Sequence, residues 1–146
     1  MRDKPKVKRI QLKTNHSQKS VMLGIVSPEP DYKLSLILNG KLRVSLKNIP
    51  PVIINDPSGT ELTFSRFSDS TASPDLVYEL ISNRSGKYFL LKKLKNIDYI
   101  FHVYNPDNEV DINQLIALLK NVECVSAVFN IDPGAIKDRN LQHITF

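Results

Sequence analysis

The sequence has few of the residues that build common catalytic or metal sites. It contains one cysteine, three histidines and no tryptophan. A single cysteine, Cys124, excludes an internal disulfide, and a lone thiol beside a strand is usually a small buried hydrophobic side chain. The histidines, His16, His102 and His143, stand far apart and have no second ligand type at metal-binding spacing. We therefore expect no metal and no cofactor.

Motifs for phosphate binding and nucleophilic catalysis are also absent. The five glycines stand singly, so neither a dinucleotide-binding fingerprint nor a P-loop can be written. There is no Gly-x-Ser-x-Gly elbow and no Cys-x-x-Cys pair. Acids alternating from Asp107 resemble the start of a calcium loop, but Ile112 and Leu118 stand where glycine and a bidentate glutamate are required. We predict no catalytic residues and expect a protein that is not an enzyme.

Long apolar segments are missing as well. No hydrophobic run approaches the length of a membrane span, and the basic, polar N-terminus has no apolar core of a secretory signal. We therefore expect a cytoplasmic protein without a membrane partner. A chain of 146 residues buries about 70% of its unfolded surface, so one domain can fold without a disulfide or a metal.

Positive charge is concentrated at the N-terminus. Residues 1–19 hold seven basic side chains and one acid, whereas the rest of the chain carries a net charge of −1. Such an arm could bind phosphates or an acidic partner. The alternative is a solvated segment that contains part of a first strand. We favour this alternative because no aromatic side chain stands among the charges to stack on bases.

The clearest local pattern is a strand, a helix and a strand in the second half of the chain. Asp111 can cap a helix whose apolar residues then recur at helical spacing. Alternating apolar residues at 97–104 and 125–131 predict strands on either side of it. A helix between two such strands must lie on a sheet, because each buries its apolar face against the other.

The first half is less clear. Alternating leucines around Asn39-Gly40 indicate a hairpin over 31–46, whereas Pro30 and Gly40 also fit the two ends of a helix. The segment 49–59 holds three prolines, and we expect a crossing loop there. Strand-like runs follow at 61–67, 76–82, 87–93 and 98–104. Their short connections predict an antiparallel meander.

The stretch Leu91-Lys-Lys-Leu-Lys-Asn-Ile-Asp-Tyr99 resembles the IPExxxVDY family, small bacterial domains of unknown function named for the signature Ile-Pro-Glu-x-x-x-Val-Asp-Tyr. The signature positions that correspond are Leu91, Ile97, Asp98 and Tyr99. Lys92 and Lys93 replace the Pro-Glu pair, which reverses a charge. The resemblance covers roughly residues 7–132 through short pieces. It implies a helix after Pro30, which we adopt over the hairpin, and it implies no activity.

The lysines at the signature form a second basic cluster. Lys92, Lys93 and Lys95 either protect the end of a sheet or join the arm in one positive surface. We favour protection. In the second case the contacts with an anionic partner are Lys4, Lys6, Lys8, Arg9, Lys92, Lys93 and Lys95. For Asp98 we expect a carboxylate that accepts turn amides, and for Tyr99 a buried ring with one hydroxyl partner.

These patterns predict an α+β protein: a two-layer sandwich in which two helices cover one face of an antiparallel sheet of five to six strands. We divide the chain into a basic arm (1–19), a single domain (20–132) and a C-terminal tail (133–146). The last strand, helix and strand are also similar to ferredoxin-type regulatory folds such as the ACT domain. We expect a non-catalytic interaction or scaffold module that forms a homodimer. The alternatives are an ACT-like small-ligand sensor and a nucleic-acid-binding protein.

Overall fold

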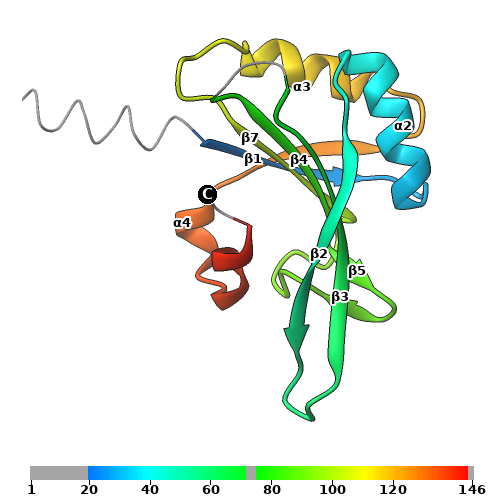
Figure 1. Cartoon of the computed structure of the whole chain (residues 1–146), viewed down its shortest axis with the longest axis vertical. Helices are drawn as coiled ribbons and strands as arrows, with labels where there is room; N and C mark the ends of the chain where they lie inside the picture. Colours follow the sequence, from blue (N-terminus) through cyan, green and yellow to red (C-terminus); the bar gives the residue numbers. More distant parts are fainter. Residues whose placement is uncertain (1–19, 72–74, 145–146) are drawn as a thin grey trace, which may run out of the picture.

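Six strands form one antiparallel sheet in the order β2-β3-β4-β7-β1-β8 (Figure 1). The structure is a computed structural model that describes residues 20–71 and 75–144. The sheet strands are β1 (Ser20–Val26), β2 (Lys47–Asn55), β3 (Glu61–Asp69), β4 (Val77–Ser82), β7 (Tyr99–Tyr104) and β8 (Ala127–Ile131). The other elements are α2 (Asp31–Leu42), the small hairpin β5 (Arg84–Ser85) and β6 (Tyr88–Phe89), α3 (Ile112–Lys120), α4 (Pro133–Ile136) and a 3-10 helix (Arg139–His143). The predicted α+β class is confirmed.

Strand β7 lies inside the sheet, and both of its faces are buried. Phe101 pairs with Leu23 of β1 and with Leu80 of β4, and these three side chains enter the core beneath the helices. Ile100 points the opposite way, into a second core. Because both faces of β7 are covered, the run 99–103 is buried throughout, including the polar side chain of His102.

Helices α2 and α3 lie together over one face of the sheet (Figure 1). The helix side chains that are buried there are Leu34, Leu38, Leu115 and Leu119. The predicted cap of α3 is present, since the carboxylate of Asp111 accepts hydrogen bonds from the backbone amides of Asn113 and Gln114. Two helices on one face agree with the predicted layer arrangement.

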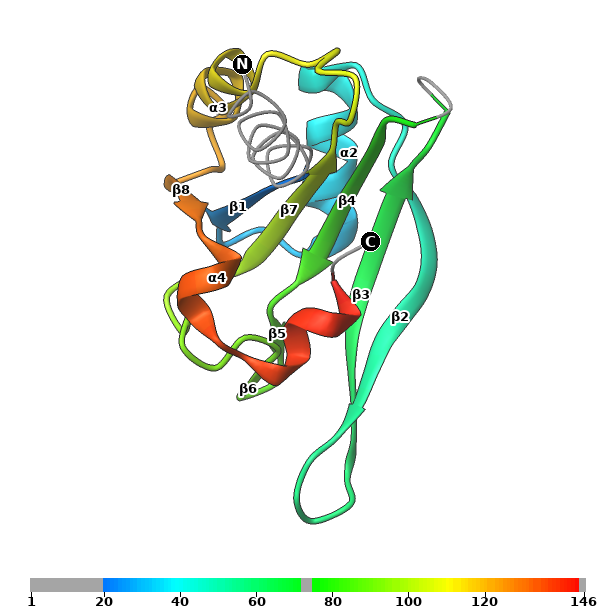
Figure 2. The same ribbon diagram turned by 90° about the vertical axis from the view of Figure 1, so that its left-hand side faces the viewer.

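The opposite face is covered by the end of the chain (Figure 2). Helix α4 and the 3-10 helix place Ile136 and Ile144 in the second core, where both side chains are at most 7% exposed. The described part of the segment that the sequence marks as a tail, residues 133–144, is therefore a packed cover of the sheet.

The ambiguous segment 31–46 contains a helix and no hairpin. Leu34 and Leu38, one turn apart, are buried, whereas Leu36 between them is 67% exposed. The alternation of leucines therefore does not mark one face of a strand. The helix runs through Gly40 and ends at Arg43, which adopts the left-handed conformation with φ 55°.

Two predictions for the loops and strands are wrong. The segment predicted as a crossing loop is β2, an edge strand whose register shifts between Ile49 and Val52, and Pro50 and Pro51 lie within that shift. An edge strand tolerates proline because half of its amides have no partner strand. The predicted strand at 87–93 is reduced to Tyr88–Phe89, and the residues after it form a loop.

Among the described helices, none has the length and apolar character needed to cross a membrane.

Candidate functional site

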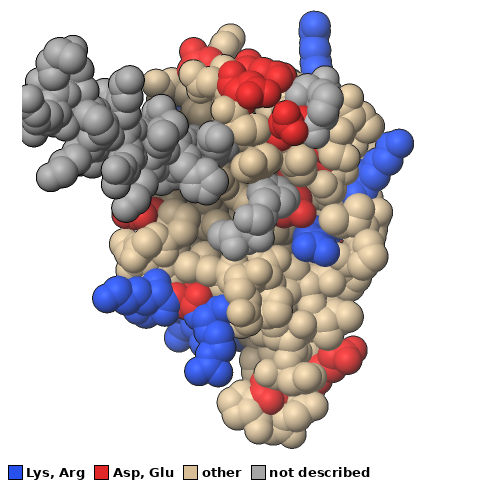
Figure 3. Space-filling view, turned by 60° about the vertical axis from the view of Figure 1, so that its left-hand side comes forward, with Lys and Arg blue, Asp and Glu red and all other residues tan. Residues whose placement is uncertain are grey.

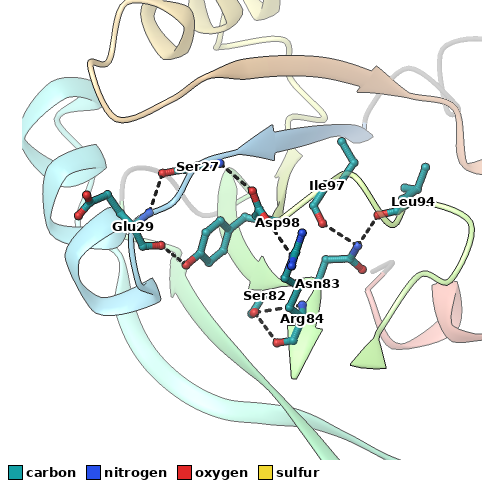
Figure 4. Close-up of polar contacts among 9 residues, drawn as sticks. Ser27, Glu29, Ser82, Asn83, Arg84, Leu94, Ile97 and Asp98 are labelled. Carbon is teal, nitrogen blue, oxygen red and sulfur yellow. Dashed lines mark hydrogen bonds and ion pairs between the residues drawn. The ribbon is translucent and has the colours of Figure 1, made fainter. Parts of the chain in front are cut away.

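The signature positions lie around a buried asparagine that folds the loop 90–97. Asn83 is 0% exposed, and its amide nitrogen donates to the carbonyl oxygens of Leu94 (2.9 Å) and Ile97 (3.0 Å) (Figure 4). Its amide oxygen accepts from the backbone amide of Leu91 at 2.8 Å. One side chain thus satisfies three buried backbone groups that no strand pairs, which explains why 90–97 leaves the sheet.

Asp98 ties the start of β7 to the connection between β1 and α2. Its carboxylate accepts from the backbone amide of Ser27 at 2.9 Å and pairs with the Nε atom of Arg84 at 2.8 Å (Figure 4). The Arg84 guanidinium also lies 5.1 Å from the ring centre of Phe89. The charge of Arg84 is therefore balanced by Asp98, and its plane is held by an aromatic ring.

Tyr99 fixes the same connection through its hydroxyl group. Tyr99 is 6% exposed, and its hydroxyl donates to the carbonyl oxygen of Glu29 at 2.5 Å. Burial raises the pKa of Tyr99 to about 12, so the hydroxyl stays protonated and acts as a donor at neutral pH. The hydroxyl oxygen of Ser27 accepts a hydrogen bond from the backbone amide of Glu29. Because α2 begins only after Pro30, Ser27 does not cap that helix. The contacts of Asp98 and Tyr99 position backbone.

Two shallow polar hollows adjoin Arg84. They have volumes of about 410 and 480 Å³, and both include Ser82 and Arg84 in their walls. Most other lining side chains are hydroxyls or carboxylates, among them Asp31, Thr63, Ser65, Ser85 and Ser126. Neither hollow contains a histidine, a lysine or a cysteine that could serve as a base or a nucleophile.

A larger groove of about 790 Å³ lies between the β2–β3 turn, the β5–β6 hairpin and the 3-10 helix. We call it the basic groove. Its lining residues are Ile54, Asn55, Asp56, Pro57, Leu62, Lys87, Tyr88, Phe89, Lys92, Asp138, Arg139 and Asn140. Figure 3 shows Lys and Arg side chains gathered on this part of the surface. Tyr88 is 40% exposed, so the groove offers an aromatic surface beside positive charge.

The basic side chains of the groove are available to a ligand. None of the ion pairs among the described residues uses Lys87, Lys92 or Arg139. The carboxylate of Asp138, in contrast, accepts from the backbone amides of Lys92 (3.0 Å) and Asn140 (2.9 Å). Part of the acidic charge at this end of the groove is therefore committed to backbone groups.

The other acid of the groove, Asp56, is held within the β2–β3 turn. It accepts from the Ser58 hydroxyl at 2.7 Å and from the amides of Ser58 and Thr60. The hydrogen bond from the Ser58 hydroxyl is the main cause that lowers the pKa of Asp56 below its ordinary value. Asp56 therefore remains ionised, and the groove has one acidic and one basic wall.

The predicted basic contacts are only partly placed by the structure. Lys92, Lys93 and Lys95 are exposed on the loop 90–97, and Lys92 lines the basic groove. Lys4, Lys6, Lys8 and Arg9, with the rest of the arm 1–19, lie outside the described residues. The sequence interpretation missed Lys87, Tyr88 and Arg139. A signal for the first two exists, since residues 84–95 include five basic side chains and no acid.

A row of polar residues crosses the second face of the sheet. Ser20 hydrogen-bonds with Nε2 of His102, and Glu79 lies 3.9 Å from both Nδ1 of His102 and the guanidinium of Arg66. The order Ser, His and carboxylate is that of a hydrolase triad. However, 3.9 Å is too long for the hydrogen bond that orients the base, and His102 is 1% exposed. The row forms packed contacts between strands.

Within residues 20–71 and 75–144, no group of three or more His, Cys, Asp or Glu side chains is arranged to hold a metal ion. Cys124 is half-buried and is not in a disulfide. The chain matches no protein-family model, no curated protein and no solved structure with which it was compared.

Proposed function

We propose that this protein is a non-catalytic interaction module that binds an acidic, partly apolar segment of a protein partner in the basic groove. The observation that carries the proposal is that Lys87, Lys92 and Arg139 line the same groove as the exposed ring of Tyr88. These three cations have no ion pair among the described residues. A bound carboxylate would therefore gain a partner without breaking a contact of the fold.

The dimensions and lining of the groove support a peptide ligand. Its volume of about 790 Å³ is within the range of sites that bury most of a small ligand. Tyr88 and Phe89 supply aromatic surface on one side, and Ile54 and Leu62 supply aliphatic surface on the other. A short segment with alternating acidic and apolar side chains can use both walls, as the aromatic and cationic residues enriched in protein interfaces do.

The charge distribution favours such a segment over a nucleic acid. Polynucleotides bind surfaces on which positive charge is continuous, because each phosphate needs a nearby cation. Here the wall formed by the β2–β3 turn carries the ionised Asp56, and Glu61 follows it in the same hairpin. A regular polyanion in the groove would face this acidic wall, whereas a peptide can place an apolar or basic residue against it.

The proposal is tested by fluorescence anisotropy with the full-length protein. The probe is a short labelled peptide in which glutamates alternate with leucine and phenylalanine, and a labelled oligothymidylate is measured in parallel. We expect the peptide to bind, its Kd to rise at least about tenfold in Lys87→Glu or Arg139→Glu, and added salt to weaken it. The matched control is Lys41→Glu, which makes the same charge change on α2 and should leave Kd unchanged.

Two outcomes would contradict this function. If both groove variants bind the peptide as well as the wild type does, the groove is not the binding site. If the oligothymidylate binds more tightly than the peptide and loses affinity in the same variants, the groove binds a nucleic acid and not an acidic peptide.

A second candidate is supported by the strand order. Strands β4, β7, β1 and β8 are adjacent, and the helices follow β1 and β7, which is the split β-α-β arrangement of ferredoxin-like folds. This topology supports the proposed likeness to ACT regulatory domains, although a fold alone does not assign a ligand. A thermal-shift screen with free amino acids tests this candidate, and no stabilisation by any of them would contradict it.

A further inference from the structure

The two edges of the sheet differ in their protection against pairing. The edge strand β2 carries Pro50, Pro51 and an irregular register, which are features that block the addition of another strand. The opposite edge strand, β8, consists of Ala-Val-Phe-Asn-Ile, with no proline and no charge. Figure 2 shows β8 at the far side of the sheet from β2.

The backbone of β8 directs hydrogen-bonding groups away from the sheet. The carbonyl oxygen of Val26 in β1 accepts from the amide of Ser126 at 2.8 Å, so Val26 faces β8, as do Gly24 and Met22 at alternate positions of β1. These residues pair with Ala127, Phe129 and Ile131, whose amides and carbonyls therefore face β1. It follows that the amides and carbonyls of Val128 and Asn130 point outward, where no strand of the described residues pairs with them.

The central residue of β8, Phe129, has an exposed aromatic side chain. Phe129 is 46% exposed, and its partner on β1 is Gly24, which has no side chain to cover it. An exposed aromatic ring on an uncharged edge is the usual composition of a strand that pairs with another chain.

We propose that β8 pairs with β8 of a second copy of this chain, in antiparallel orientation about a two-fold axis at Phe129. In this register Ala127 of each copy faces Ile131 of the other, and the two Phe129 residues face each other. The outward residues Val128 and Asn130 of each copy then form hydrogen-bonded pairs with Asn130 and Val128 of the other, with about four backbone hydrogen bonds in total. The two six-stranded sheets become one continuous sheet.

The chemistry of the edge fits a second copy because the register is self-complementary. The nearest charge, Asp132, directly follows β8 and lies opposite Ser126 of the other copy, so no like charges face each other. The two Phe129 rings become cross-strand neighbours and cover one another.

The proposed dimer is independent of the basic groove. The groove is built by the β2–β3 turn, the β5–β6 hairpin and the 3-10 helix, and no residue of β8 lines it. A dimer through β8 therefore leaves both grooves open, and loss of the dimer would not by itself remove peptide binding.

Sedimentation of the full-length protein over a range of concentrations tests the proposal. We expect a monomer–dimer equilibrium, and Phe129→Lys should raise the dimer Kd at least about tenfold, because two ammonium groups would face each other at the two-fold axis. The matched control is Ile53→Lys on the other edge strand, where the side chain is also half exposed (50%), and it should leave the equilibrium unchanged. A wild-type protein that remains monomeric into the millimolar range would refute the dimer.

The register has its own test. In a Cys124→Ser background, Phe129→Cys places two thiols on the axis in a non-hydrogen-bonded pair with Cα atoms about 4.5 Å apart, which suits a disulfide. We expect oxidised glutathione to cross-link this variant into a covalent dimer. Asn130→Cys is the matched control, since residue 130 faces Val128 of the other copy, and it should remain uncross-linked. Equal cross-linking of both variants, with unchanged thermal melting, would exclude this pairing.

Discussion

Gly24 and Ile97 approach each other so closely that no side chain fits between them. A Cβ atom added to Gly24 would lie 2.7 Å from Cδ1 of Ile97 and 3.1 Å from Cδ1 of Ile131. Gly24 lies in β1, and Ile97 is 2% exposed in the loop that Asn83 holds. The absence of a side chain on β1 thus allows the loop 90–97 to pack against the sheet.

We expect Gly24→Ala to lower the free energy of unfolding by about 1–3 kcal/mol, because an extra methyl group overpacks a filled core. Urea denaturation measures the change. The additional variant Ile97→Val, which removes Cδ1, should recover part of the loss.

Gly40→Ala is the matched control for this substitution. Gly40 is exposed within α2, and an added Cβ would meet no atom within 4 Å. Alanine is the better helix former, so this variant should gain about 0.5–1 kcal/mol. Equal effects of both alanines would contradict the packing argument.

Removal of the Asn83 side chain should loosen the whole loop 90–97. Asn83→Ala removes the acceptor of the Leu91 amide and the donor to the carbonyls of Leu94 and Ile97, and we expect a loss of about 2–4 kcal/mol. Hydrogen exchange should accelerate at Leu91, which uses this side chain as its acceptor.

The comparison variant is Asn83→Asp. A carboxylate can still accept from Leu91 but cannot donate to the two carbonyls, so its stability should be no better than that of the alanine variant. Native-like stability of Asn83→Asp would show that the donated hydrogen bonds do not hold the loop.

Tyr99 should make the fold sensitive to alkaline pH. Its pKa is raised by burial from 10.0 to about 12, so between these values the unfolded state releases the phenol proton while the folded state retains it. The unfolded state is then favoured as pH rises, and we expect a loss on the order of 1–2 kcal/mol through this window. Stability below pH 10 is unaffected by this group.

Tyr99→Phe removes both the hydrogen bond to Glu29 and this titration. It should be less stable by about 1 kcal/mol at pH 7, with a shallower decline above pH 10, measured by urea unfolding at each pH. Tyr78, whose pKa burial also raises, should supply the remaining slope. An unchanged slope would mean that Tyr99 does not titrate as a buried group.

Asp69 should contribute to stability only when ionised. Burial acts to raise its pKa, but hydrogen bonds from Thr71 and from the amide of Ser45 outweigh it, so the pKa is lower than the ordinary value of 3.8. A group with a lowered folded pKa stabilises the protein above the unfolded value, and this contribution disappears as pH falls through the folded value.

Asp69→Asn should therefore cost about 1–2 kcal/mol at pH 7, and the difference from the wild type should shrink below about pH 4. Thermal or urea unfolding over this range measures the difference. A gap that stays constant down to pH 2 would show that the carboxylate charge is not what stabilises the turn.

The parts of the fold that could be predicted from sequence are those set by local signals. Asp111 followed by apolar residues at helical spacing leaves few alternatives to α3, and its cap is confirmed. The central strand β7 is recognisable from the alternation of Ile97, Tyr99, Phe101 and Val103. In both cases the local sequence also indicates where the element begins and ends.

The parts that could not be predicted depend on contacts between distant residues. The segment 87–93 has strand composition, but Asn83 binds the backbone that a ladder would otherwise pair. The prolines of β2 are tolerated only because β2 is an edge strand, and its position in the sheet is not encoded locally. For 31–46, the resemblance to a family favoured the helix where the spacing of leucines favoured a hairpin.

The basic groove was only partly foreseeable for the same reason. Lys92 and Lys87 lie in one stretch without acids, whereas Arg139 reaches them through the packing of the chain end. The amide of Lys92 donates to Asp138, and Asn140 donates to the carbonyl of Leu90 at 2.7 Å. No local pattern in the sequence brings these two segments together.

The fixed loop 90–97 has a consequence for recognition. A flexible recognition loop loses conformational entropy when a partner docks, at a cost of about 1–2 kcal/mol for each residue whose backbone becomes ordered. Here Asn83 and Asp138 already restrain the backbone on either side of Lys92 in the free protein. The backbone at Lys92 is thus preorganised. A ligand that contacts the ammonium group therefore does not have to order the loop, and more of the interaction energy remains as affinity.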